Sequence, residues 1–402
     1  MAYYFIFPEK DATLYSHPDR TKMNTGDDEI LEIVKEKGTG NLYYPSRALI
    51  QFKNEDILTV INNKITSNVF TNGTSQACLQ LFTSEHKNLA NILNLEVFPL
   101  SQSWDEGTGR YSNLPTSSNG CSWLYRDNDA IQNQSLWVSS SLFSGSYTSS
   151  LAPGTTASFG TQTPTSSNHS NVPEGGGAWY TGSAFQGSQQ FLNGDSLDTD
   201  INITDIVTKH YRNLNSNITY PLGIPNNGLI IKQPDTVEQE MSASFGEMRY
   251  FSVNTHTIFP PKLAFKWDDS VHSSQSLAKQ KGELSISLYR NQEEYNQNDE
   301  ATFRIHVRDK YPIRQFTSSS NFLNPGYFTT SSFYSVRDAH TEEEIIPFDN
   351  NFTKISADGD GMYFKIYMKG LQPERYYRVL FKHTNNEGTT VYDNNYHFKV
   401  IR

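Results

Sequence analysis

The residues best suited to bind a ligand or a partner are aromatic side chains in a long polar stretch. Residues 108–195 are rich in serine, threonine, glycine and asparagine, and scattered among them are Trp123, Trp137, Trp179 and Tyr180. Such rings stack on sugars, and they are also favoured anchors at protein interfaces. We therefore predict that these four side chains contact a glycan or a partner protein, and the sequence leaves both alternatives open.

Other motifs that could support catalysis are incomplete. Trp104–Asp105–Glu106 places two carboxylates beside an indole, but neighbouring residues of a strand point to opposite faces and cannot flank one glycosidic bond. Gly175–Gly176–Gly177 lacks the Lys and the Ser or Thr of a phosphate-binding loop, and no Gly-x-Ser-x-Gly elbow occurs. The three glycines instead predict a tight loop beside Trp179. The sequence therefore predicts no enzyme, no catalytic residue and no cofactor.

Two acidic segments could offer oxygen atoms to a cation. Asp358–Gly359–Asp360–Gly361 lacks the distal glutamate of an EF-hand loop, so it predicts a hairpin turn instead. Asp11 together with Asp27–Asp28–Glu29 could also hold a cation, although a solvated turn is the simpler interpretation. The ten histidines are scattered, and we predict no metal site.

Composition narrows the classes of protein. The 402 residues include 33 Lys and Arg and 43 Asp and Glu, a formal charge of −10, and this diffuse acidity argues against nucleic-acid binding. No stretch approaches transmembrane length, and the first residues lack the basic start of a signal peptide. We expect no membrane partner, and a protein made in a cytoplasm and not exported by the usual signal. Pairing of Cys78 with Cys121 stays open.

Alternating apolar residues indicate an all-β chain with two domains. Ala48, Ile50 and Phe52 share one face of a predicted strand, and Phe303 and Ile305 repeat the pattern later in the chain. From such segments we predict three parts of the chain: a β-sandwich over 1–267 with the loop insertion 108–195, a linker over 268–282, and a second β-sandwich over 283–402.

The order of several short motifs resembles a known module. Asp11–Ala12–Thr13–Leu14, Asn24–Thr25–Gly26, and the run from Arg47 to Phe52 follow one another as in DNRLRE-type modules, which are carbohydrate-binding-module-like jelly rolls. Thr204–Asp205–Ile206–Val207 and Asn226–Asn227–Gly228 continue the match beyond the insertion. The resemblance implies a jelly-roll β-sandwich over 1–267 and a module that often binds glycans. The family version of residues 108–195 is shorter.

The second domain resembles an immunoglobulin- or fibronectin-like sandwich. Leu371–Gln372–Pro373–Glu374–Arg375–Tyr376 precedes the run Tyr377–Arg378–Val379–Leu380–Phe381, similar to the tyrosine-corner entry to a late strand of that fold. The length of about 120 residues also suits such a domain.

These features bear on three functions. Tandem β-sandwiches with long polar loops and no catalytic cluster resemble, in overall style, the virion structural proteins of tailed bacteriophages. We therefore predict a structural component of the tail, baseplate, neck or head surface, located in the virion, whose partners are other virion proteins and copies of itself. The alternative is a carbohydrate-binding or adhesion protein that recognises a glycan through exposed aromatics. A polysaccharide-degrading enzyme is disfavoured by the carboxylate geometry.

Overall fold

The computed structural model describes most of the chain, namely residues 2–38, 43–65, 70, 74–113, 119–129, 133–137, 158–160, 175–192, 194–215, 223–239, 246–273, 278–279, 283–289, 291–311, 326–328, 330–385 and 388–402. Of these residues 50% lie in strands and 13% in helices, so the prediction of an all-β fold is confirmed. Parts of the predicted insertion 108–195 and of the predicted linker 268–282 lie outside the described residues. In the described ranges no helix has the length and apolar character to cross a membrane.

The chain divides into two compact units. The N-terminal unit comprises Ile6–Ser67 and Gln76–Ala264, and the C-terminal unit comprises Met1–Phe5, Asn68–Ser75 and Phe265–Arg402. Three of the described strands contain residues of both units: β1 (Ala2–Ile6), β6 (Ser75–Gln80) and β17 (Lys262–Trp267).

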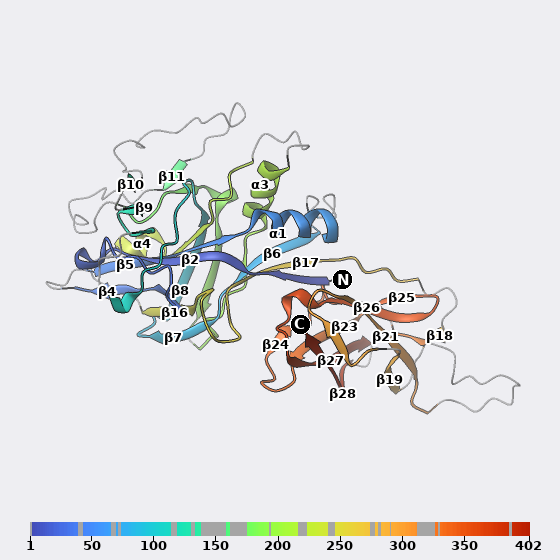
Figure 1. Cartoon of the computed structure of the whole chain (residues 1–402). Helices are drawn as coiled ribbons and strands as arrows, with labels where there is room; N and C mark the ends of the chain where they lie inside the picture. The colour runs from blue at the N-terminus through green and yellow to red at the C-terminus, as the bar shows by residue number, and fades with distance from the viewer. Residues whose placement is uncertain are drawn as a thin grey trace, which may run out of the picture. The chain divides into compact units, whose positions relative to one another are not determined.

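The N-terminal unit contains a large sheet (Figure 1). Its strand order is β13–β8–β15–β5–β2, with β4 paired to β5, and these neighbours are antiparallel. The strands are β13 (Gly187–Leu192), β8 (Ile92–Pro99), β15 (Leu229–Lys232), β5 (Tyr43–Phe52), β2 (Pro8–Tyr15) and β4 (Lys35–Lys37).

Shorter strands and helices complete this unit. A smaller sheet has the order β3–β16–β7, and β6 pairs with β14. These strands are β3 (Ile30–Ile33), β16 (Glu247–Phe251), β7 (Thr83–Lys87), β6 (Ser75–Gln80) and β14 (Ile201–Asn202). The helices are α1 (Asn54–Thr59), which continues as a π-helical turn (Val60–Ile65), α3 (Thr204–Leu214) and α4 (Asp235–Gln239).

Helix α3 forms where its sequence predicts a helix. Its N-terminal residue Thr204 donates its backbone N–H to the side-chain oxygen of Asn202 at 3.0 Å, which satisfies one of the free donors of the first turn. Ile206, Val207 and Tyr211 recur on one side and are buried. That side faces the body of the unit, and α3 lies beside α1 (Figure 1).

Both faces of the larger sheet are covered. In the register, Ala12 on β2 is opposite Leu49 on β5, Leu49 is opposite Ile230 on β15, and Ile230 is opposite Phe98 on β8. These four residues form an apolar row across one face, while their sequence neighbours Ala48 and Ile50 are also fully buried on the other. A strand buried on both sides requires a layer of protein over each face.

The C-terminal unit contains two sheets that pack together. The first has the order β19–β21–β26–β25 and the second β20–β28–β27–β23–β24. Phe303 of β21 lies 5.3 Å from Phe364 of β26 and 5.2 Å from Phe398 of β28, ring centroid to ring centroid, so aromatic side chains join the sheets. The strands are β19 (Leu284–Tyr289), β21 (Glu300–Asp309), β26 (Gly361–Tyr367), β25 (Ser356–Asp358), β20 (Glu294–Asn296), β28 (Gly388–Ile401), β27 (Arg375–Asn385), β23 (Ser332–Asp338) and β24 (Glu344–Ile346), with a further pair, β18 (Ala278–Lys279) and β22 (Gly326–Tyr327).

A buried tyrosine fixes the start of β27. The hydroxyl of Tyr377 donates to the carbonyl oxygen of Gln372 at 3.0 Å and accepts the backbone N–H of Gln372 at 2.7 Å. Bonding back to the backbone a few residues upstream is the defining feature of a tyrosine corner. The finer assignments of the two units, to a jelly roll and to an immunoglobulin- or fibronectin-like sandwich, stay predictions.

Candidate functional site

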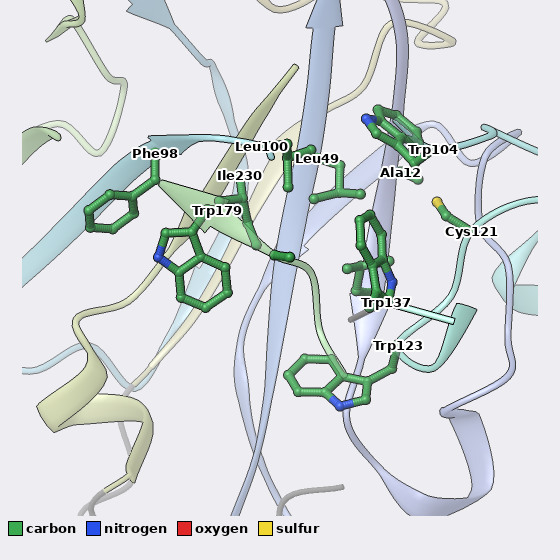
Figure 2. Close-up of a cluster of buried hydrophobic side chains, with 12 residues drawn as sticks. Ala12, Leu49, Phe98, Leu100, Trp104, Cys121, Trp123, Trp137, Trp179 and Ile230 are labelled. Carbon is green, nitrogen blue, oxygen red and sulfur yellow. The ribbon is translucent and has the colours of Figure 1, made fainter. Parts of the chain in front are cut away.

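Three of the four predicted contact residues belong to a core cluster. Trp123, Trp137 and Trp179 are 0%, 2% and 2% exposed, and they pack with the apolar row of the larger sheet (Figure 2). The prediction that these rings stand exposed is therefore wrong. The apolar face of the sheet needs a cover, and the insertion supplies it. The cluster consists of Ala12, Leu14, Leu49, Phe98, Leu100, Trp104, Cys121, Trp123, Trp137, Ala178, Trp179 and Ile230.

Local pairing brings the three tryptophans to the sheet. Strand β9 (Tyr125–Asp129) pairs with β10 (Asn133–Leu136), so Trp123 and Trp137 come to the same end of that strand pair. The indole N–H of Trp137 donates to the carbonyl oxygen of Ser122 at 2.8 Å. Strand β12 (Trp179–Thr181) pairs with β11 (Ser158–Gly160), and Trp179 also bridges to Leu100.

A buried arginine lies between two of these rings. The guanidinium carbon of Arg47, on β5, is 4.7 Å from the ring centroid of Trp123 and 5.0 Å from that of Trp179. The guanidinium also forms a bidentate ion pair with Glu238 of α4, with distances of 3.2 Å (Nε–Oε1) and 2.7 Å (Nη2–Oε2). Both side chains of the pair are completely buried. Aromatic faces and a matching carboxylate are what a desolvated guanidinium requires.

Lysines extend this buried ionic group. Lys232, at the end of β15, lies 3.5 Å from the Glu238 carboxylate and 2.7 Å from that of Asp235. Two cations, Arg47 and Lys232, thus face two carboxylates, and the group is formally neutral. Lys35 donates to the carbonyl oxygen of Val237 at 2.6 Å, which satisfies an unpaired carbonyl of α4.

The three predicted loop glycines close over the arginine. Gly175, Gly176 and Gly177 have φ values of 122°, 77° and 95°, so the predicted tight loop is confirmed. Gly176 accepts a hydrogen bond from Arg47 through its carbonyl oxygen, and its backbone N–H donates to the carbonyl oxygen of Trp123 at 2.7 Å. A Cβ atom on Gly176 would lie 2.6 Å from the Trp123 ring and 2.7 Å from Arg47 Nη1.

A second buried polar contact holds the start of the insertion. The side-chain Nδ2 of Asn24 donates to the carbonyl oxygens of Glu106 at 2.6 Å and of Cys121 at 2.8 Å. Its Oδ1 accepts the backbone N–H of Gly109 at 2.7 Å and that of Gly26 at 3.3 Å. All four hydrogen-bonding positions of the amide are used, so Asn24 fixes the N-terminal turn against residues 106–121.

Next to Asn24 lies a carboxyl group with a perturbed pKa. Asp11 is 1% exposed, and its burial, together with the nearby Glu106 carboxylate, raises its pKa to about 8. The hydrogen bond from the backbone N–H of Val253 lowers the pKa and offsets part of this increase. That N–H donates to Oδ2 at 2.7 Å, while Oδ1 has no hydrogen-bond partner among the described residues. Burial also raises the pKa of Glu106, which accepts the backbone N–H of Asp11 at 3.0 Å.

Only the fourth predicted residue keeps a partly exposed ring. Tyr180 stacks on Phe185, with a centroid distance of 5.6 Å and an interplanar angle of 24°, and the ammonium of Lys209 lies 5.0 Å from the Phe185 centroid. Partial burial raises the pKa of the Tyr180 hydroxyl. An aromatic pair with a neighbouring cation is a surface on which a polar ligand can stack.

The predicted cation segments are used for other contacts. Asp358 pairs with Gly361 across the hairpin turn from β25 to β26, as predicted, and its carboxylate receives Arg304 Nη1 at 2.7 Å. Asp27 pairs with Arg110 at 2.6 Å. Over the described ranges, no three His, Cys, Asp or Glu side chains are grouped as metal ligands. Cys78 and Cys121 are both buried, and no disulfide joins them.

Sequence reasoning missed Arg47, Lys232 and Glu238. A signal was present, because Arg47 adjoins the run Ala48–Leu49–Ile50 and Lys232 ends Leu229–Ile230–Ile231. Continuous apolar runs of this kind indicate strands covered on both faces. A charge at such a position must be paired, which predicts a carboxylate partner but not which one.

Comparison with known proteins adds no assignment. No protein-family model matches the sequence, and a search of curated proteins gives no significant match. The resemblance to DNRLRE-type modules therefore stays a prediction. The fold and the site define an all-β protein whose insertion is partly built into its core.

Alanine at Gly176 tests the packing over Arg47. A left-handed backbone costs a non-glycine residue about 1–2 kcal/mol, and the overpacking of Trp123 and Arg47 should add about 1–3 kcal/mol. The control is Gly194→Ala, where φ is 99° but nothing lies within 4 Å of the added methyl group. Guanidinium unfolding followed by tryptophan fluorescence should give Gly176→Ala the larger loss of stability. Equal losses would contradict the described packing.

Replacement of Asp11 tests its environment through pH. Its folded-state pKa of about 8 lies above the ordinary value of 3.8, so its favourable contribution is complete below pH 3.8 and disappears as pH rises to about 8. The stability of Asp11→Asn relative to the wild type should therefore increase between pH 5 and 8, by up to about 1.4 kcal/mol per pH unit. Thermal unfolding across this range measures the difference. A difference independent of pH would show that Asp11 is solvated.

Proposed function

We propose that this protein is a structural component of a tailed-bacteriophage virion, in the tail, baseplate, neck or head surface, and that it acts by protein–protein assembly. The observation that carries the proposal is the burial of the insertion tryptophans against the sheet of their own unit. Rings that are enclosed cannot stack on a sugar unless the core opens. An insertion anchored in the core suits a building block, for which interface area and shape matter more than reactive groups.

An exposed apolar pair at the end of the larger sheet supports an assembly role. Ile92 on β8 and Leu192 on β13 face each other in the register and are 57% and 53% exposed. β13 is the terminal strand in the order of that sheet. A terminal strand with apolar side chains is a site where another chain can add a strand or bury surface.

The aromatic pair Tyr180 and Phe185 favours a second candidate, a carbohydrate-binding protein. Tyr180 is the one predicted contact residue whose ring is partly exposed. The ammonium of Lys209 lies over the Phe185 ring and offers a hydrogen-bond donor beside the aromatic pair. The acidic chain, at −10, also suits both candidates better than a nucleic-acid-binding role.

Mass spectrometry of density-banded particles from the source separates the candidates. The proposal predicts this chain in the particles at a copy number comparable with that of other virion proteins. Absence of the chain from the particles would contradict the proposal. The carbohydrate-binding candidate would replace it if, in addition, the isolated protein is retarded in polysaccharide gels and Tyr180→Ala removes the retardation while Tyr289→Ala does not. Tyr289 is a suitable control because its side chain is exposed in the other unit.

A further inference from the structure

The C-terminal unit has an open groove that the predicted contact residues do not touch. Its volume is about 560 Å³, within the range of about 300–1,000 Å³ that is usual for small-molecule sites. Three segments line it: the end of β23 with the following turn, the start of β27, and β28. The lining residues are Asp338, Ala339, His340, Glu374, Arg375, Tyr376 and His397.

Two of the lining residues, Asp338 and Arg375, form a fixed ion pair. Oδ2 of the buried Asp338 carboxylate receives Arg375 Nε at 2.7 Å and Nη2 at 2.6 Å, and Oδ1 accepts the backbone N–H groups of His340 and Thr341, each at 2.9 Å. Burial of Asp338 is outweighed by these donors, which lower its pKa to about 2. Arg375 is thereby held in one orientation.

Hydrogen bonds also fix the turn after β23 and the start of β27, which line the groove. The backbone N–H of Ala339 donates to the carbonyl oxygen of Tyr376 at 2.9 Å, and the tyrosine corner at Tyr377 fixes the entry to β27. Glu374 has a φ of 64°, an uncommon conformation for a residue other than glycine, and its N–H donates to the carbonyl oxygen of Val400. A pre-formed site loses less entropy when a ligand binds, and strained residues concentrate at functional sites.

Carboxylates outnumber cations among the charged residues around the groove. Asp338 is paired with Arg375, and Glu374 is paired with Lys399 at 2.6 Å. Arg378, opposite His397 in the register, is paired with Glu342 and Asp393, and Glu343 adds a carboxylate near Arg375. Three cations thus face five carboxylates, an excess of negative charge that disfavours an anionic ligand, so a neutral ligand with many hydroxyl groups fits better than an anion.

The groove lining includes one exposed aromatic side chain, Tyr376. Tyr376 is 58% exposed, whereas its neighbour Tyr377 points into the core. Tyr376 is opposite Lys399 in the register, and His397 is two residues from Lys399 on β28, so the ring and the exposed imidazole of His397 lie on one face of this strand pair. The exposed imidazole of His340 also lines the groove. A flat ring with surrounding planar hydrogen-bonding groups suits the C–H face and the hydroxyl groups of a sugar.

We propose that this groove binds a neutral saccharide, with Tyr376 stacking on the sugar ring and with His340 and His397 bonding its hydroxyl groups. The inference does not depend on the proposed virion role, because a building block and a soluble binding protein can each carry such a site. It differs from the carbohydrate-binding alternative in placing the sugar in the C-terminal unit and away from Tyr180.

Affinity electrophoresis of the full chain tests the groove. The probes are neutral starch, xylan, galactomannan and laminarin, with alginate and heparin as acidic comparators. At least one neutral polysaccharide should retard the wild type, and Tyr376→Ala and His397→Ala should each weaken binding by about tenfold or more. Tyr289→Ala, an exposed tyrosine of the same unit outside the groove lining, should bind like the wild type.

Several results would overturn the inference. One is the absence of retardation by every neutral polysaccharide in the panel. Another is retardation that both groove variants retain, or that Tyr180→Ala removes instead. Retardation by alginate or heparin alone, abolished by salt, would identify an anion site. Circular dichroism of the variants establishes that a loss of binding is not a loss of folding.

Discussion

The guanidinium of Arg47 is a full positive charge on the sheet face that carries the apolar row. Such a charge is tolerated in the interior only when it is paired and its hydrogen bonds are satisfied. Glu238 supplies the matching carboxylate, Gly176 supplies a carbonyl oxygen, and the indoles of Trp123 and Trp179 cover the planar faces. Because the two indoles and Gly176 belong to the insertion, the charge can be buried only if the insertion docks on the sheet.

Because burial of Arg47 requires the insertion tryptophans, these side chains are not available as a binding surface. The insertion resembles a polar loop in composition, yet its anchors form the second layer of the larger sheet. Its tryptophans are therefore committed to the fold, and binding must use other surfaces. The structure offers three: the apolar pair Ile92 and Leu192 beside the end of the larger sheet, the stacked rings of Tyr180 and Phe185, and the groove around Arg375.

Local patterns predicted the local features. The alternation around Phe303 and the turn at Asp358 depend on neighbouring residues, and both occur as expected. The exposure of Trp123 and Trp179 was predicted wrongly because it depends on partners far along the chain. Arg47 and Glu238 are 191 residues apart, and no local pattern specifies that pairing. The groove is likewise assembled from β23, β27 and β28, which only the folded sheet brings together.

Acrylamide quenching of intrinsic fluorescence tests the central claim most directly. All five tryptophans, Trp104, Trp123, Trp137, Trp179 and Trp267, are buried. The native protein should therefore show blue-shifted emission and weak quenching, and both should change sharply on unfolding in guanidinium. Strong quenching and red-shifted emission in the native state would show that the insertion does not cover the sheet, and would contradict this account.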